Sequence, residues 1–468
     1  MTKIKAQLTE GPIFFKLLAF TVPIILTSLL QTAYNIADTV VVGQFSGDEL
    51  AIAAIGATAS LTTLFIGVMV GLSTGSGILI ARRYGSGDGE GVSRALHTSM
   101  LFSVIVGVAV ATLALVFSEA VVTLMGTRAE YFDRAVLYFR WIAVGMPFTA
   151  IYNFGASALR SVGDSKTPLL ILGISGLLNV GLNIVFVLCF NMTVDGVAIA
   201  TSVSKLVSAI WVVLVLVSRR RECYCLKMNS LKIHKESLFE MLYLGIPTAL
   251  QSALFSFANV IITGSVNSLS PASMSAKTIQ EQIMNLPGSA LNSFTPALAT
   301  FTAQNHGAMK PERIKRGILY SLLQTTVIGL LAGLLIRSIL PFLVGMFVAE
   351  DSSIREEIFA TVTSVLSWYS LTFFLLGVMN ALSGALRGLG RSLTSMFISL
   401  ISVFGIRIVW TAFIFPLEEF HSLAGLYICF PVSWLFCTVF MGIFTIIAYR
   451  KIFKKRLDSD TPKEYING

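Results

Sequence analysis

The sequence contains few charged residues for its length. Of its 468 residues, 13% are Asp, Glu, Lys or Arg and 55% are hydrophobic, whereas soluble domains average about 25% charged and about 45–50% apolar residues. A soluble domain or a disordered chain would need more polar residues, and a nucleic-acid-binding protein would need a basic surface on a soluble fold. The composition excludes these three classes and indicates a membrane protein with many spans.

Cysteine and histidine are also scarce. The five cysteines are an odd and scattered set, so they provide no disulfide framework. The four histidines are isolated, and the sequence has neither a Walker A motif nor the spacing of a metal site or a catalytic triad. We therefore expect no enzyme, no bound metal and no cofactor, and we expect that ATP hydrolysis on this chain does not drive transport.

Long apolar runs make up most of the chain. A helix needs about 20 apolar residues to cross a bilayer, so twelve spans would use roughly 240 residues. Twelve runs of this kind occur, at residues 14–43, 51–81, 95–118, 131–158, 168–190, 196–218, 238–267, 273–303, 317–348, 357–386, 393–416 and 422–449. The sequence thus predicts an all-α membrane protein with twelve transmembrane helices.

Lysine and arginine are distributed unevenly between the predicted loops. The two ends of the chain and every second loop contain 25 of the 34 Lys and Arg residues, whereas the opposite loops contain three. Positively charged loops remain in the cytoplasm. We therefore expect a multi-pass protein of the cell membrane with both termini in the cytoplasm.

The two halves of the sequence resemble each other at a spacing of about 225 residues. The segment that ends at Gly85 matches the segment that ends at Gly307, and the segment from Asn153 matches the segment from Asn380. Six spans in each half would give both halves the same orientation, and two parallel repeats around a central cleft suit alternating access. The predicted parts are an N-terminal six-helix bundle at 1–218, a basic cytoplasmic linker at 219–236, a C-terminal six-helix bundle at 237–450 and a cytoplasmic tail at 451–468.

One acidic residue lies deep within the first predicted span. Asp38 precedes the seven residues TVVVGQF, which places it about 10 Å inside the end of the helix. Thr27, Gln31, Tyr34 and Asn35 precede it at helical spacing and form a polar stripe on one face. Because an ionisable group in lipid costs several kcal/mol, this stripe should line a cavity. The alternative is that Asp38 only terminates the helix near the lipid headgroups.

Other polar residues lie within the fourth, fifth and sixth predicted spans. Asn179 and Asn183 are one helical turn apart in the fifth span, Asn153 lies in the fourth and Thr201 in the sixth. Asn and Thr in membrane bundles commonly form hydrogen bonds between helices. From spacing alone, such structural bonds are the simpler interpretation of these residues.

The second half has no counterpart of the aspartate in the first span, and Asn259 lies in the corresponding region. Its eighth predicted span instead has a polar stripe that includes Lys277, Glu281 and Asn285. Lys277 and Glu281 have i, i+4 spacing and can neutralise each other, or Glu281 can be the acid of a second cation or substrate site. Arg407 in the eleventh span either pairs with Glu281 or extends to a membrane interface.

Five segments resemble those of the MATE family, the multidrug and toxic compound extrusion transporters. They are NIADTVVVGQF (35–45), GLSTGSGILIARRYG (71–85), GASALRSVGDSKTPL (155–169), DGVAIATSVS (195–204) and FTAQNHGAMKPERIKR (301–316). The resemblance extends over residues 12–450. It implies a V-shaped fold of twelve helices and an antiporter that exports amphipathic organic compounds in exchange for H⁺ or Na⁺.

The resemblance also implies a cation site. Family members use an acid in the first span, a Tyr four residues earlier and polar residues in spans four to six. The matching residues in this sequence are Asp38, Tyr34, Asn153, Asn179 and Thr201. Many relatives have Asp at the position of Asn183, so this chain has one carboxylate fewer, and the transported ion can be H⁺ or Na⁺.

The sequence thus predicts a cation-coupled exporter of small organic molecules that works as a monomer in the lipid bilayer and binds no nucleic acid. The alternative is a lipid-linked oligosaccharide or lipid flippase of the same superfamily. The cavity of such a flippase should contain several Arg or Lys residues that hold a pyrophosphate. The spans of this chain instead combine Lys277 and Arg407 with Asp38 and Glu281.

Overall fold

The computed structural model describes residues 7–45, 48, 50–266, 268–347 and 355–460, and within these ranges all regular structure is helical. The predicted tail therefore lies partly outside the described residues. The helices of the first half are Ile13–Phe45 (α1), Ala51–Gly85 (α2), Gly89–Val116 (α3), Ser118–Leu124 (α4), Ala129–Ser161 (α5), Lys166–Phe190 (α6) and Val194–Ser218 (α7).

The second half begins with Lys235–Val266 (α8) after the linker. Its other helices are Pro271–Asn292 (α9), Phe294–Gly307 (α10), Pro311–Ser338 (α11), Leu340–Gly345 (α12), Arg355–Tyr369 (α13), Phe373–Gly388 (α14), Ser392–Ser399 (α15), Ile406–Val409 (α16), Leu423–Tyr427 (α17) and Cys429–Asp460 (α18). Two π-helical turns, Leu400–Gly405 and Trp410–Ile414, flank α16, so that α15, α16 and these turns form one span.

Among the described residues, eleven helical stretches are long and apolar enough to cross a membrane. They correspond to eleven of the twelve predicted spans. The stretch at 273–303 differs because the helix is interrupted at Ser293 and because α9 carries several polar side chains, including Lys277, Glu281 and Asn285. The predicted all-helical, multi-span membrane fold is confirmed, and the least apolar span is the one with the polar stripe.

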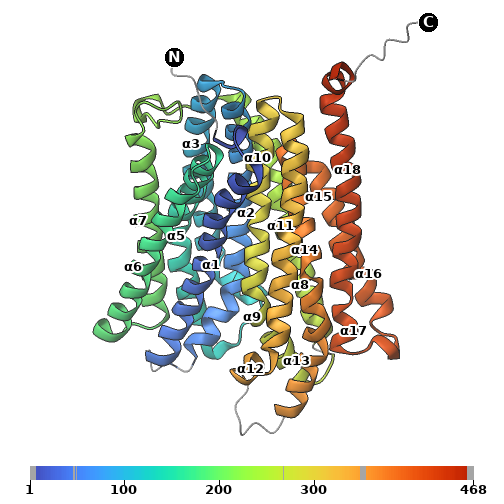
Figure 1. Cartoon of the computed structure of the whole chain (residues 1–468). Helices are drawn as coiled ribbons and strands as arrows, with labels where there is room; N and C mark the ends of the chain where they lie inside the picture. Colours follow the sequence, from blue (N-terminus) through green and yellow to red (C-terminus); the bar gives the residue numbers. More distant parts are fainter. Residues whose placement is uncertain (1–6, 46–47, 49, 267, 348–354, 461–468) are drawn as a thin grey trace, which may run out of the picture.

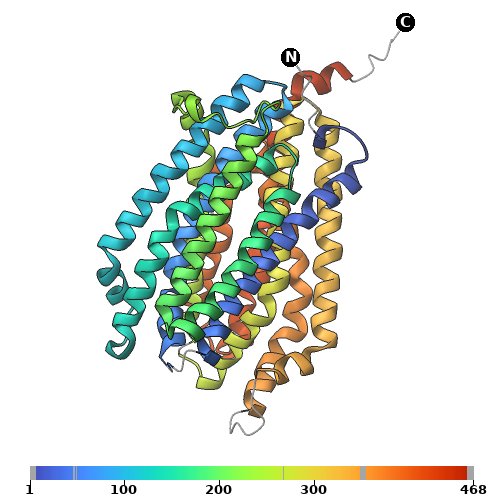
Figure 2. The same cartoon turned by 90° about the vertical axis from the view of Figure 1, so that its left-hand side faces the viewer.

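The two halves have equivalent internal packing. In the first half, α5 is the central helix and packs against α2, α3 and α7; in the second half, α14 packs against α10, α11 and α18 in the same way. The start of α1 and the end of α18 lie at the same end of the molecule, which we call the termini end (Figure 1). The helices run between this end and the opposite end, where α12, α13 and α17 lie (Figure 1), and Figure 2 shows the same arrangement from the side.

The halves contact each other closely at the termini end, where α2 packs along α8 and α10. A methyl group at Gly85 would overlap the carbonyl oxygen of Gln304, and a methyl group at Gly307 would overlap the carbonyl oxygen of Arg82. The matched glycines of the repeat therefore each allow the other half to approach its backbone. Gln304 Nε2 also donates a 2.6 Å hydrogen bond to the carbonyl oxygen of Ser161, which ties α10 to α5.

Further from the termini end, the contact between α1 and α9 is polar. The hydroxyls of Ser28 and Ser293 are 2.9 Å apart, and those of Thr32 and Ser289 are 3.4 Å apart. About one turn beyond Thr32 and Ser289, the same helix faces carry Asn35 and Asn285. Both of these residues are exposed. Among the described residues, the hydrogen bonds between the halves thus stop near the middle of these helices, and polar side chains beyond that point are open to solvent.

Candidate functional site

Asp38 accepts hydrogen bonds from two other helices of the first half. Asn183 Nδ2 on α6 donates to Oδ1 at 2.5 Å, and Thr201 Oγ1 on α7 donates to Oδ2 at 3.3 Å. Asn179 Nδ2 donates in turn to Thr201 Oγ1 at 3.2 Å. The structure thus brings together four of the predicted site residues in one network of three helices.

Local helix geometry explains this arrangement. Asn179 and Asn183 are one turn apart, so both project from the same face of α6. That face lies against α1 and α7, because α6 packs on both helices. Asn183 is fully buried, and its side-chain oxygen Oδ1 has no hydrogen-bond partner among the described residues. An unpaired acceptor therefore lies beside the carboxylate, and such an oxygen suits a proton donor or a cation.

Three other predicted members of the site form no hydrogen bond to Asp38. The Tyr34 hydroxyl donates to the carbonyl oxygen of Gly173 at 3.0 Å, and its ring packs on Gly176, where the lack of a side chain leaves room for it. Asn153 Nδ2 donates to the carbonyl oxygen of Thr149 on its own helix at 2.9 Å. The Asn35 side chain is exposed. These three residues therefore do not belong to the hydrogen-bonded network of Asp38.

Two residues near Asp38 were not part of the predicted site. Lys205 on α7 and Tyr138 on α5 both interact electrostatically with the Asp38 carboxylate. Lys205 follows Thr201 by four residues, so it lies on the same helix face, and this spacing is visible in the sequence. No comparable signal identifies Tyr138, because its proximity depends on how α5 packs against α7 and the rest of the first half.

The polar stripe of the second half contains an ion pair. Lys277 Nζ lies 2.7 Å from Glu281 Oε1 on α9, as their spacing allows. Arg407 forms no ion pair with Glu281 and does not reach an interface, because its side chain is only 6% exposed. Both expectations for Arg407 were wrong. Its Nη1 instead donates to Asn259 Oδ1 on α8 at 3.3 Å, while Asn285 is exposed.

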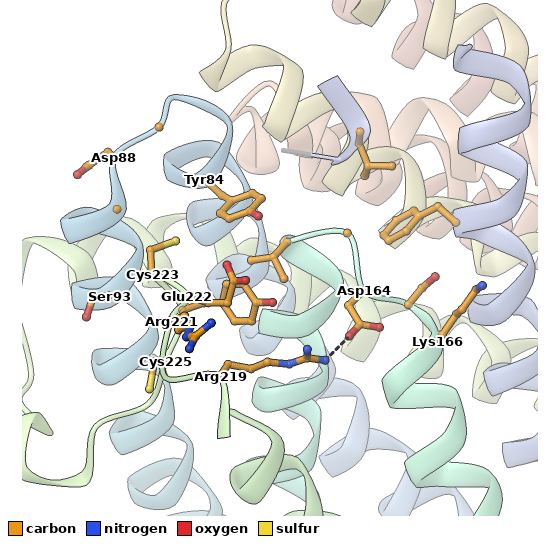
Figure 3. Close-up of a pocket in the computed structure, with 18 of the residues that line it drawn as sticks. Tyr84, Asp88, Ser93, Asp164, Lys166, Arg219, Arg221, Glu222, Cys223 and Cys225 are labelled. Carbon is orange, nitrogen blue, oxygen red and sulfur yellow. Dashed lines mark ion pairs between the residues drawn. The ribbon is translucent and has the colours of Figure 1, made fainter. Parts of the chain in front are cut away.

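A separate cavity of about 1860 Å³ lies at the termini end of the first half (Figure 3). The start of α1, the α2–α3 turn, the start of α6 and the linker form its walls, and charges of both signs line it, including the Arg219–Asp164 ion pair at 3.6 Å. Burial and the adjacent Glu222 raise the pKa of the Cys223 thiol to about 11, so this thiol is uncharged at neutral pH. None of the predicted site residues lies in this cavity.

Two equivalently packed helical halves of many spans each are typical of a membrane transporter built from a repeat. A family model described as MatE matches residues 23–185 and 247–413, most of the chain. The chain therefore belongs to the MATE family, as its sequence motifs predicted, and it is a multi-pass membrane transporter rather than an enzyme.

Individual relatives are similar over nearly the full length. The chain is 27% identical to the probable multidrug resistance protein YoeA of Bacillus subtilis, with 89% of each chain covered. It is 25% identical to an FAD transporter of Shewanella oneidensis, with 85% of this chain and 87% of that protein covered. The structure of a MATE family multidrug resistance transporter in an outward-facing conformation has a TM-score of 0.88 at 21% identity, covering 97% of this chain and 100% of the other.

Proposed function

We propose that the protein is a cation-coupled antiporter that exports organic compounds by alternating access. The observation that carries this proposal is the hydrogen-bonded network around Asp38, a carboxylate inside a span with donors from α6 and α7. A membrane-embedded carboxylate is costly unless it serves a pathway or a relay. Binding of a cation at Asp38 changes the charge of this network, and that change is the coupling event.

The contact between the halves supports alternating access. At the termini end the halves meet backbone to backbone at Gly85 and Gly307. Beyond Thr32 and Ser289 the facing polar residues are exposed. This arrangement corresponds to a state that is closed at the termini end, and rocking of one half against the other exchanges the open and closed ends.

The site favours H⁺ over Na⁺ as the coupling ion. A Na⁺ ion needs several oxygen ligands and benefits from a second anion, but this chain has Asn183 at the position where the family resemblance implies an Asp in many relatives. Lys205 also offsets the charge of Asp38. A proton needs only one carboxylate oxygen, and a tenfold proton gradient supplies about 1.4 kcal/mol.

The ion preference can be measured in vesicles that contain the purified protein and an organic dye. We expect a pH gradient at constant Na⁺ to drive dye movement, and we expect a Na⁺ gradient at constant pH to have little effect. Strong stimulation by Na⁺ alone would reverse the assignment of the ion. Absence of movement with either gradient, for a panel of cationic and anionic dyes, would contradict the antiporter proposal itself.

We also propose that the termini end faces the cytoplasm, because 25 of the 34 Lys and Arg residues lie in the ends and loops of that side. Cysteines introduced at Asp48, Ser270 and Glu418 of a cysteine-free variant should react with a membrane-impermeant thiol reagent added to intact cells. Cysteines at Gly87, Lys227 and Lys310 should react only after the cells are opened. The opposite labelling pattern would show that the orientation is inverted.

The names of relatives support organic substrates, since they specify drugs in several cases and FAD in one. A flippase is less consistent with the charges in the spans. Lys277 is paired with Glu281, and Lys205 lies near Asp38. These lysines are therefore not free to hold a pyrophosphate, and Arg407 supplies one cation where a pyrophosphate needs several, so we propose small organic molecules as the transported class.

A further inference from the structure

Arg407 is a buried cation without a carboxylate partner. Its side chain is 6% exposed, and no described Asp or Glu oxygen lies within 4.0 Å of it, because Glu281 is paired with Lys277. Its hydrogen bond to the neutral Asn259 is long, at 3.3 Å. Burying an uncompensated charge is costly. At Arg407 the second half therefore contains a positive charge within a span that no described carboxylate balances at close range, and Arg387 in α14 is another such residue.

The guanidinium presents one unused edge. Nη1 is bound to Asn259, whereas Nε and Nη2 have no hydrogen-bond acceptor among the described residues. Nε and Nη2 are the two parallel donors with which an arginine binds a carboxylate or phosphate in a bidentate manner. The edge of Arg407 that lacks a partner is thus the edge suited to an oxyanion.

Aromatic rings surround this guanidinium. The ring of Phe430 lies 4.1 Å from the Arg407 carbon Cζ, which stabilises the cation through its π face. Phe430 stacks on Tyr427 with ring centroids 5.0 Å apart, and Tyr427 contacts Tyr369 at 5.3 Å. Tyr369 and Tyr427 are buried, whereas Phe430 is half-buried, so Phe430 offers the accessible ring face on which a planar organic ring attached to the anionic group would stack.

Arg407 itself is buried, but two residues in its neighbourhood reach the surface. Its partner Asn259 is exposed, as is Glu281, which interacts electrostatically with Tyr369 and Tyr427. π-Helical turns precede and follow the short α16 that carries Arg407. Such turns often occur at functional sites, and they allow a helix to shift locally without unfolding.

We propose that the second half binds the anionic group of an aromatic organic substrate at the Nε and Nη2 edge of Arg407. The rings of Tyr369, Tyr427 and Phe430 then form the adjoining aromatic surface. This inference rests on the proposed transport function and specifies its substrate class: organic anions or zwitterions with a planar ring and a carboxylate or phosphate.

The test compares two xanthene dyes, anionic carboxyfluorescein and cationic rhodamine 123, whose binding to the protein in nanodiscs is followed by fluorescence anisotropy. We expect Arg407→Gln to weaken carboxyfluorescein binding by about tenfold or more, the loss of a charge-assisted bidentate contact. Rhodamine 123 binding should not weaken. Arg128→Gln, which removes an exposed arginine, is the matched control and should leave both affinities unchanged.

Two further variants avoid the risk that removal of a buried arginine disturbs folding. Asn259→Asp at an exposed position supplies an internal carboxylate to Arg407 and should also weaken carboxyfluorescein binding about tenfold. Glu281→Gln removes a negative charge near Arg407 and should strengthen carboxyfluorescein binding. Unchanged carboxyfluorescein affinity in both Arg407→Gln and Asn259→Asp would overturn the proposal. Weaker binding in Glu281→Gln would also overturn it, because Arg407 would then act with Glu281 rather than with the substrate.

Dye binding is measured without any ion gradient. The experiments can therefore contradict the proposed transport function and the proposed substrate class independently of each other. Carboxyfluorescein that binds through Arg407 but is not moved by any gradient would contradict the transport proposal alone. Gradient-driven transport of rhodamine 123, together with carboxyfluorescein binding that ignores Arg407, would contradict the substrate class alone.

Discussion

Replacing Asp38 with Asn should abolish gradient-driven efflux, so that the dye leaves the vesicles no faster than it leaves vesicles without the protein. Asn keeps the shape of the side chain but has no charge and no group that gains and loses a proton. The Asp38 carboxylate accepts hydrogen bonds from both Asn183 and Thr201. Replacing it with an amide therefore also changes the hydrogen bonds that these two side chains form. Efflux of an organic dye from vesicles under a pH gradient measures the loss.

Asp133→Asn is the matched control for this experiment. Asp133 lies on α5 but is exposed, so its replacement removes the same charge from the surface of the same half. The control should transport at the rate of the unmodified protein, and both variants should insert at the same level. Gradient-driven efflux that persists in Asp38→Asn would show that Asp38 is not the coupling group.

Replacing Gly307 with Ala should reduce transport by about tenfold through a different mechanism. The added methyl group would overlap the carbonyl oxygen of Arg82, which belongs to the backbone of the other half and cannot rotate away. Overpacking of this kind typically costs about 1–3 kcal/mol, and about 1.4 kcal/mol already changes the ratio of two conformations tenfold. The conformation in which the two halves are in contact at the termini end should therefore become the less populated one.

Spin labels at the exposed residues Glu90 and Glu312 would report this change, since they lie on opposite halves at the termini end. We expect a longer distance between them in Gly307→Ala than in the unmodified protein. Gly56→Ala is the control, because a methyl group at Gly56 meets nothing within 4 Å. An unchanged distance together with normal efflux in Gly307→Ala would mean that this contact does not limit the cycle.

Several properties follow from local sequence alone. Apolar runs longer than a bilayer is thick specify helical spans, because every backbone group in lipid needs a hydrogen bond within its own helix. Spacing along one helix was also informative: it gave the Lys277–Glu281 pair as one of two interpretations, and it placed Asn179 and Asn183 on one face. The same spacing argument could also have placed Lys205 beside the site, because Lys205 follows Thr201 by one helical turn.

Contacts between helices could be anticipated only where family motifs indicated them. The bonds from Asn183 and Thr201 to Asp38 join residues 145 and 163 positions apart, and they require α1, α6 and α7 to have particular rotations about their axes. The apolar faces of these helices fit lipid and protein equally well, so hydrophobic periodicity does not set those rotations. The resemblance to the MATE family named Asp38, Asn179 and Thr201, which lie in one hydrogen-bonded network, but it also named Asn153, whose amide binds its own helix.

Arg407 is an example of a residue whose place in a span follows from the sequence but whose partners follow only from the tertiary structure. The sequence determined that a guanidinium lies within a span, that Glu281 is the acid of a neighbouring polar stripe, and that the two halves are related by a repeat. Only the tertiary structure decided that Arg407 lies against Asn259 and Phe430 on other helices and forms no ion pair with Glu281. The physical reason is that a helix fixes its own i, i+4 neighbours, whereas partners on other helices depend on how the whole bundle packs.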